Sequence, residues 1–196
     1  MSAPNQKEQS IRVLILDAAG ALLDEVGIEG LTTTAVARRA KISTSTLYQH
    51  FPDKTAILHA TIVHLHELRR KSLLKLIEPI ATATDWREPV TKAVLVAYEM
   101  RKTQPGARSA RRALQASPEL WKLEQTVIEE LADAVGKLFR ARKPSLKPAV
   151  ARRIALVGVS ISINLADLAD LSPKRSKEII DELISVLITY LAKHLD

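Results

Sequence analysis

The segment from Thr44 to Phe51 carries polar side chains on one side and large apolar side chains on the other. In a helix, which turns about 100° per residue, Leu47 and Phe51 lie one turn apart on a face that must pack against a core. The opposite face then carries Ser45 and Gln49. A glutamine can form two hydrogen bonds with the edge of adenine, and a serine hydroxyl can pair with several bases. This spacing predicts a surface that could recognise base edges.

Other polar side chains near this face extend its chemistry. Thr44 directly precedes Ser45, so base recognition is expected to concentrate at Thr44, Ser45 and Gln49. Thr33 and Thr34 begin an earlier helical stretch, where hydroxyl and amide donors and the helix dipole favour an anion. We therefore expect Thr33 and Thr34 to contact phosphate.

The sequence offers little chemistry for catalysis or for metal binding. It has no Gly-rich phosphate loop, no His-Glu-x-x-His and no Gly-x-Ser-x-Gly. His64 and His66 are two positions apart, so on a helix they point about 200° away from each other and cannot chelate one metal ion. The absence of cysteine excludes disulfides and thiolate metal sites. We predict no enzyme, no metal site and no cofactor.

The composition favours helices. Aromatic residues make up 4% of the 196 residues and glycine numbers 6, while Leu, Ile, Val and Ala fill the apolar share. The first residues are polar and lack the apolar core of a signal peptide, and no uninterrupted apolar run approaches the ~20 residues that span a bilayer. We therefore expect an all-α, cytoplasmic protein with no membrane segment.

The distribution of charge is more informative than its total. The net charge of +7 permits attraction to phosphate. Residues 1–54, however, hold six basic and six acidic residues, so this part is neutral as a whole. Within residues 31–54, four basic residues face one acidic residue. The local excess therefore supports nucleic-acid binding better than the global charge does.

The N-terminal part of the chain has the pattern of three short helices. They are expected at 9–26, 33–40 and 44–50. Gly27 is expected to end the first, and Thr32 and Ser43 to cap the second and third. About three residues separate the second helix from the third, which is the plan of a helix-turn-helix.

The rest of the chain carries six further helical patterns, which makes about nine helices in all. They are expected at 54–78, 85–102, 109–115, 118–140, 148–170 and 172–195. The last two are unusually apolar, and their surplus apolar surface must be covered. This predicts a subunit interface, and hence a homodimer, at the two C-terminal helices.

The segment from Gly27 to Lys54 resembles the DNA-binding domain of the tetracycline-repressor (TetR) family, over roughly a quarter of the chain. The resemblance rests on Leu31-Thr32-Thr33, Val36-Ala37, Ile42-Ser43, Thr46-Leu47-Tyr48, His50-Phe51 and Lys54. The chain has Ala35 where the family often has a charged residue, and Lys41 where the family usually has glycine. A β-carbon in a left-handed conformation costs ~1 to 2 kcal/mol, so the turn at Lys41 is expected to be strained or slightly different.

The resemblance implies a helix-turn-helix domain at residues 1–54, with a helical ligand-binding and dimerisation domain at 55–196. It also implies that Thr46, Tyr48, His50 and Lys54 contact the DNA backbone, for which hydroxyl, imidazole and ammonium donors are suited. Tyr48 has the alternative role of a packed core tyrosine, and Lys54 that of a solvated charge.

The function implied is that of a transcriptional repressor released from its double-stranded operator when an unknown small molecule binds. Polar residues set in the apolar C-terminal helices are the candidates for lining a pocket, although each could also have a structural role. They are His64, Tyr98, Arg101, Trp121, Asn164 and Asp167. The alternative reading is a helical adaptor or dimerisation module without sequence-specific DNA binding.

Overall fold

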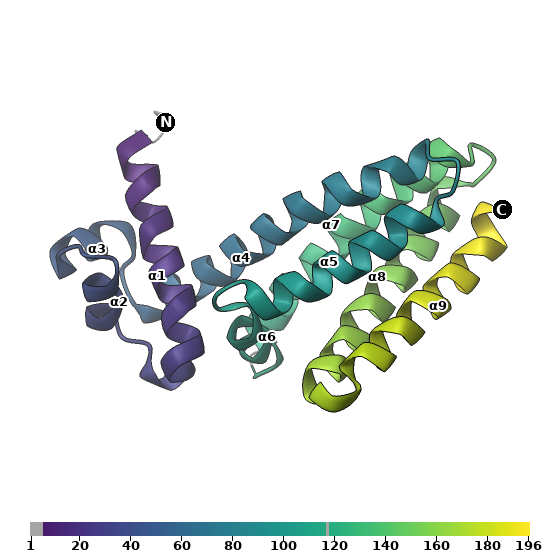
Figure 1. The fold of residues 1–196 in the computed structure, drawn as a ribbon. Helices are drawn as coiled ribbons and strands as arrows, with labels where there is room; N and C mark the ends of the chain where they lie inside the picture. The colour runs from purple at the N-terminus through teal and green to yellow at the C-terminus, as the bar shows by residue number, and fades with distance from the viewer. Residues whose placement is uncertain (1–5, 117) are drawn as a thin grey trace. The chain divides into compact units, whose positions relative to one another are not determined.

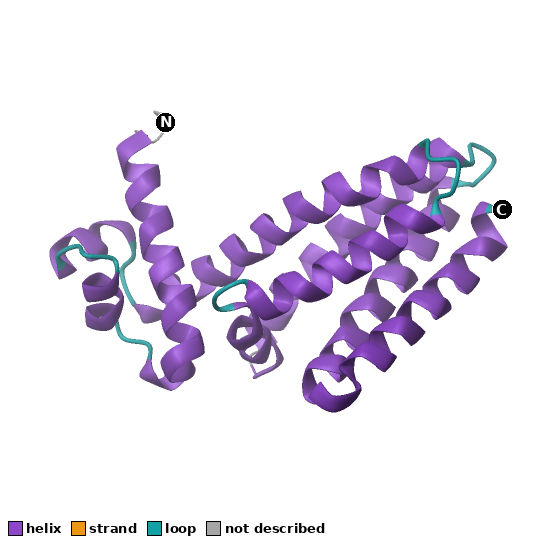
Figure 2. Cartoon of the chain, viewed as in Figure 1, coloured by secondary structure: helices purple, strands orange, loops and turns teal. Residues whose placement is uncertain are grey.

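A computed structural model describes residues 6–116 and 118–196, and this part of the chain is helical and contains no strand (Figures 1 and 2). Its α-helices are α1 (Gln6–Gly30), α2 (Thr33–Arg39), α3 (Thr44–His50), α4 (Lys54–Ile77), α5 (Arg87–Thr103), α6 (Ala107–Ala116), α7 (Pro118–Arg142), α8 (Pro148–Leu171) and α9 (Ser176–Leu195). Short 3-10 helices follow α4, at Glu78–Ala81, and precede α9, at Pro173–Arg175. The all-α prediction with about nine helices is confirmed.

The predicted caps of α2 and α3 are present. The Thr32 Oγ1 accepts a hydrogen bond from the Ala35 backbone N–H at 3.2 Å, and the Ser43 Oγ accepts one from the Thr46 N–H at 3.0 Å. Each bond satisfies one of the backbone donors that a helix leaves free at its start. Gly27 has a φ of 67° and interrupts α1, so the regular part of that helix ends before it.

The chain forms two compact units. The first contains residues 1–68 and 101–122, and the second contains residues 69–100 and 123–196. The first unit therefore combines the three N-terminal helices and the first part of α4 with α6, which comes much later in the sequence.

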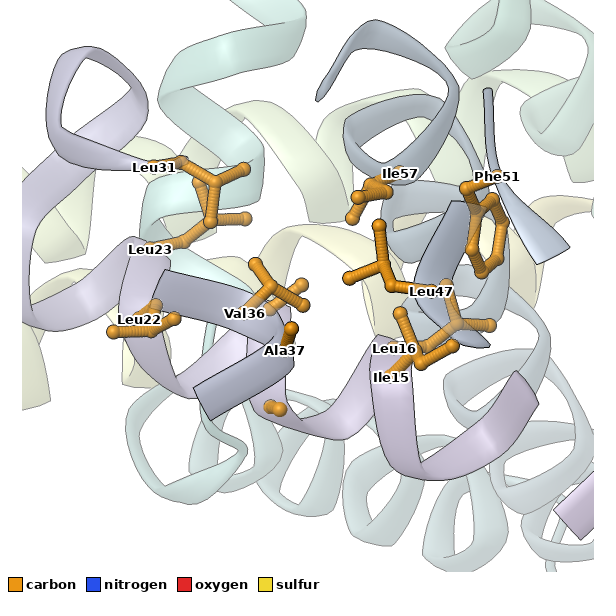
Figure 3. Packing of buried hydrophobic residues seen from close by; sticks show 12 residues of the cluster. Ile15, Leu16, Leu22, Leu23, Leu31, Val36, Ala37, Leu47, Phe51 and Ile57 are labelled. Atoms are coloured by element: carbon orange, nitrogen blue, oxygen red, sulfur yellow. The ribbon is translucent and has the colours of Figure 1, made fainter. Parts of the chain in front are cut away.

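The core of the first unit joins its short helices (Figure 3). Ile15 and Leu23 from α1, Val36 from α2, Leu47 from α3 and Ile57 from α4 are all almost completely buried. Full burial of a side chain of this size contributes roughly 1.5 to 3 kcal/mol. This shared core allows α2 and α3, with seven residues each, to hold their shape.

The start of α6 is attached to α1 by a carboxylate and a close backbone contact. Asp24 accepts hydrogen bonds from the Gly106 N–H at 2.5 Å and from the Ser109 hydroxyl at 2.9 Å. Gly106 has a φ of +81°, and a Cβ there would lie 2.7 Å from the Cα of Gly20. Only glycine therefore fits at position 106 without a shift of the backbone.

The second unit is built from the end of α4 with α5, α7, α8 and α9. Trp86, Phe139, Ile154 and Leu191 lie in one of its buried clusters. The indole N–H of Trp86 donates a hydrogen bond to the Asp196 carboxylate at 2.9 Å, which ties the end of α9 to the segment that precedes α5. Helices α8 and α9 pack along each other.

Helix α8 leaves much of its apolar surface uncovered. Among the described residues it is the one helix long and apolar enough to cross a bilayer by these criteria, although the core helix of a soluble protein meets them too. This helix contains polar residues such as Ser160, Ser162 and Asn164, so it is not an uninterrupted apolar run, and its mean hydropathy alone makes it a candidate. Only 28% of the apolar stretch is buried, and Leu168 and Leu171 are 47% and 82% exposed.

Candidate nucleic-acid interface

Helix α3 presents the predicted polar face to solvent. Leu47 and Phe51 are 0% and 2% exposed and belong to the core of the first unit. Ser45 and Gln49, on the opposite side, are exposed. The assignment of faces made from helical spacing therefore agrees with the burial of these four side chains.

The N-terminal end of α3 combines an exposed residue with a tightly held one. Thr44 is exposed, whereas Thr46 is partly buried. The Thr46 hydroxyl lies 2.8 Å from the Ser43 hydroxyl, so the two form a hydrogen bond in addition to the backbone cap. Thr46 thus helps to shape the start of the helix.

Two predicted phosphate contacts meet between α2 and α3. The Thr33 hydroxyl lies 3.1 Å from the Tyr48 hydroxyl, within hydrogen-bond distance. The Tyr48 side chain is 53% exposed, so it is not a packed core tyrosine. Thr34, next to Thr33, is also exposed. Hydroxyl groups gathered in this way are suited to phosphate oxygens.

The end of α3 and the start of α4 carry the remaining predicted contacts. His50 and Lys54 are both partly buried. The Lys54 ammonium lies 3.4 Å from the backbone carbonyl of Glu29, to which it donates. Lys54 therefore makes a contact within the protein and is not a fully solvated charge.

The turn between α2 and α3 is left-handed and strained. Lys41 has a φ of 56°, and its N–H donates to the Arg38 carbonyl at 3.2 Å. The Ile42 N–H donates to the Ala37 carbonyl at 3.0 Å. These two bonds define a Schellman motif, in which the residue at the position of Lys41 is usually glycine. Of the two outcomes expected for this turn, strain is the one found.

Two arginines on α2 have different surroundings. Arg39 donates to the Glu25 carboxylate on α1 at 2.6 Å, so its charge is paired within the protein. Arg38 is exposed on the same helix. The positive charge of this region is therefore smaller than the count of basic residues suggests.

The six predicted ligand contacts are divided between the two units. His64, Arg101 and Trp121 belong to the first, and Tyr98, Asn164 and Asp167 to the second. The His64 ring nitrogen lies 3.2 Å from the Asp17 carboxylate of α1, and Trp121 is 53% exposed. Arg101 is 8% exposed. The three residues of the first unit therefore differ widely in their surroundings.

The residues of the second unit also have distinct environments. Tyr98 is 8% exposed and packs in a cluster with Ala166 and Leu183. Asn164 is exposed and donates to the Ser160 carbonyl of its own helix at 2.8 Å. Asp167 is partly buried. Contact of any of the six residues with a ligand remains a prediction.

The sequence analysis did not single out Arg12, which lies beside the end of α3. The Arg12 guanidinium of α1 lies 4.3 Å from the centre of the Phe51 ring and donates to the His50 carbonyl at 3.4 Å. Arg12 and His50 are 38 positions apart. A basic residue on the polar side of a predicted helix gives no indication of such a distant partner.

Comparisons with known proteins agree with this geometry. Residues 15–61 match the family model of bacterial regulatory proteins, tetR family. Residues 85–191, more than half of the chain, match the model of the tetracyclin repressor-like C-terminal domain. Over 54 residues the chain is 41% identical to the HTH-type transcriptional regulator BetI of Burkholderia thailandensis and 44% identical to the class D tetracycline repressor of Escherichia coli. These matches span 28% of this chain and 28% and 25% of the two relatives.

Solved structures match over nearly the whole length. A TetR-family transcriptional regulator from Streptomyces coelicolor has 26% identity and a TM-score of 0.69, with 94% of this chain and 99% of that chain covered. SmeT of Stenotrophomonas maltophilia has 18% identity and a TM-score of 0.71, with coverages of 97% and 93%, which shows a shared fold. Because one family model covers residues 15–61 and the other covers more than half of the chain, the chain belongs to the TetR family of bacterial regulatory proteins.

Proposed function

We propose that this protein is a transcriptional regulator that binds double-stranded operator DNA as a homodimer and is released by a small molecule. The observation that carries the proposal is the exposed polar face of α3, with Ser45 and Gln49 opposite the buried Leu47 and Phe51. Membership of a family of regulatory proteins supports regulation, and not catalysis, as the activity.

In this proposal residues 1–54 form the DNA-binding domain, and α3 lies in the major groove. Thr44, Ser45 and Gln49 contact base edges there, because a major groove distinguishes all four base pairs by their donors and acceptors. The remaining predicted contacts position the domain through phosphates. They are Thr33, Thr34, Thr46, Tyr48, His50 and Lys54.

The apolar surface left uncovered on α8 and α9 supports the homodimer. Leu168 on α8 and Val186 on α9 are 47% and 43% exposed, as expected for side chains that a second subunit covers. A two-fold dimer would present two α3 helices about 34 Å apart, which is one turn of DNA. The operator would then have two related half-sites.

Release by a small molecule requires that the ligand bind one arrangement of the dimer more tightly than the other. Couplings of about 1 to 3 kcal/mol, equivalent to about 5- to 150-fold in DNA affinity, are usual. SmeT, which shares the fold, is described as the repressor of a multidrug efflux pump and was solved with triclosan. This relative supports a ligand-controlled repressor, with the pocket in residues 55–196.

The test begins with selection of genomic DNA fragments by the full-length protein, followed by measurement of Kd for the selected duplex at several salt concentrations. We expect specific binding that weakens steeply as salt rises. Gln49→Ala should relax the preference at one base pair by about 1 to 3 kcal/mol, whereas Lys54→Ala should weaken all duplexes about equally and lower the salt slope by about one.

Failure to enrich any sequence would favour the helical adaptor. An unchanged base preference in Gln49→Ala would show that the assignment of the reading face is wrong, even if the protein binds DNA.

A further inference from the structure

The DNA-reading helix is too short to be stable by itself. Helix α3 has seven residues, and isolated helices of fewer than about 12 residues are marginal in water. Its direction must therefore come from contacts at both ends and from its buried face. At the N-terminal end the contact is made by Ser43, which caps the helix.

At the C-terminal end the contact comes from another helix. The Arg12 guanidinium of α1 lies over the ring of Phe51, the residue that ends α3, at 4.3 Å from the ring centre. One Arg12 nitrogen also donates to the His50 carbonyl at 3.4 Å. Arg12 itself is exposed, whereas Phe51 is buried. A cation from α1 therefore covers the point where α3 ends.

The chemistry of this contact is specific to arginine. A guanidinium is planar, so it can stack on an aromatic face and still donate sideways to a carbonyl, which a lysine ammonium cannot do in the same way. The carbonyl ends of a helix carry partial negative charge, which a cation stabilises. At 3.4 Å the hydrogen bond is long, so the stacking on Phe51 is the stronger part of the contact.

We propose that Arg12 is a positioning residue for DNA recognition, which acts by fixing the last turn of α3. This turn carries Tyr48, Gln49 and His50, so a change in its direction alters both base and phosphate contacts. The proposal rests on the proposed function, since it concerns how the same DNA interface is held. Arg12 acts through Phe51 and His50 and does not itself contact DNA.

The experiment compares Arg12→Gln and Arg12→Lys with the unmodified full-length protein on the selected duplex, at a temperature where urea titration shows all of them folded. Arg12→Gln should weaken specific binding about two- to fivefold, the factor equivalent to an exposed cation–π contact. Arg12→Lys should recover less than half of this loss, because it restores the charge without the planar stack. The salt slope should be the same in all three proteins.

The matched control is Arg108→Gln, which removes an equal charge. Arg108 is exposed on α6, and the start of this helix contacts Asp24 of α1. Asp24 lies 12 residues from Arg12, which is about 18 Å along α1, so the control is far from the contact being tested. This variant should bind the duplex as the unmodified protein does. A second control is Phe51→Leu, which keeps a buried apolar side chain but removes the ring. Adding Arg12→Gln to Phe51→Leu should change the affinity for the duplex little further, because the ring that Arg12 contacts is already absent.

Three results would overturn the proposal. Unchanged affinity in a folded Arg12→Gln variant would leave Arg12 a purely structural residue. A salt slope lowered by about one, with full recovery in Arg12→Lys, would make Arg12 a direct phosphate contact. Unchanged hydrogen exchange of the amides at 47–51 in free Arg12→Gln would show that the end of α3 does not depend on Arg12. This last measurement needs no DNA, so it separates failure of this proposal from failure of DNA binding.

Discussion

Lys41 has a strained backbone conformation close to the exposed polar face of α3. It is the one non-glycine residue with a positive φ in the described part of the chain, and it lies in the turn that joins α2 to α3. The two hydrogen bonds of the Schellman motif hold it there. The motif forms in this chain although lysine is disfavoured at its left-handed position.

Replacing Lys41 by glycine should stabilise the fold. Glycine removes about 1 to 2 kcal/mol of left-handed strain, but the unfolded chain then gains flexibility worth about 0.4 to 1 kcal/mol. We expect a net gain of roughly 0.5 to 1 kcal/mol in the free energy of unfolding, measured by urea titration. Lys41→Ala is the control, because alanine keeps the β-carbon and should give no comparable gain.

Asp196 should make stability depend on pH at the acid end. The hydrogen bond from Trp86, and then the hydrogen bond and the positive charge of Arg87, lower the pKa of its carboxyl group below the usual value. A group with a lower pKa in the folded state stabilises the fold above its unfolded pKa, and this contribution is lost as pH falls through the folded pKa.

The measurement is the Tm of the unmodified protein and of Asp196→Asn from pH 7 down to about pH 3, through the usual Asp pKa of about 3.9. The unmodified protein should be more stable at neutral pH, and the two Tm values should converge in acid. A constant difference across this range would contradict the role given to the carboxylate.

The junction of α1 with α6 illustrates how two helices distant in sequence are joined. Asp24 of α1 accepts hydrogen bonds from Gly106 and Ser109, which are 82 and 85 positions away. The carboxylate thus caps a helix that it does not belong to, and the Gly106 backbone contacts Gly20. Together these contacts make α6 part of the unit that contains α3.

Gly106→Ala should loosen this junction. The added Cβ would lie 2.7 Å from the Gly20 backbone, and the positive φ adds strain, so we expect a loss of more than about 2 kcal/mol. Gly27→Ala is the matched control, since Gly27 also has a positive φ but nothing within 4 Å of its added Cβ. Gly27→Ala should lower the free energy of unfolding only by the left-handed strain, about 1 to 2 kcal/mol. Equal losses in urea titration would mean that the contact with Gly20 contributes nothing.

At the scale of the whole molecule, the proposed dimer rests on apolar surface that the described part of one chain leaves exposed. Helices α8 and α9 pack along each other, yet Leu168, Leu171 and Val186 are exposed. In a soluble protein such a surface is normally covered by a partner. In the proposed dimer a second copy of the chain would cover this surface and would also bring together two copies of α3.

Leu168→Glu and Val186→Glu should each convert the proposed dimer to a monomer, because each places a charge at the proposed interface. Light scattering should report half the mass, and DNA affinity should fall by roughly 100-fold or more as the linkage between half-sites is lost. Leu95→Glu is the control, since Leu95 is 47% exposed on α5. A dimer that persists in both α8 and α9 variants would place the interface elsewhere.

Local patterns in the sequence determined most of the secondary structure and which face of α3 is exposed. Apolar periodicity located the helices, Thr32 and Ser43 marked two helix starts, and Leu47 and Phe51 oriented the third helix correctly. Such features depend on residues a few positions apart, and their geometry follows from the helix itself. The resemblance at residues 27–54 then pointed to the family that the comparisons established.

The tertiary structure decided which distant residues meet. The contact of Arg12 with Phe51, the capping of α6 by Asp24 and the pairing of Thr33 with Tyr48 all join separate helices. It also divided the six candidate ligand residues between two units, although each lies in an apolar helical pattern. Periodicity states which side of a helix is buried, but the partner of that side is chosen by the packing of the whole chain, which no local pattern encodes.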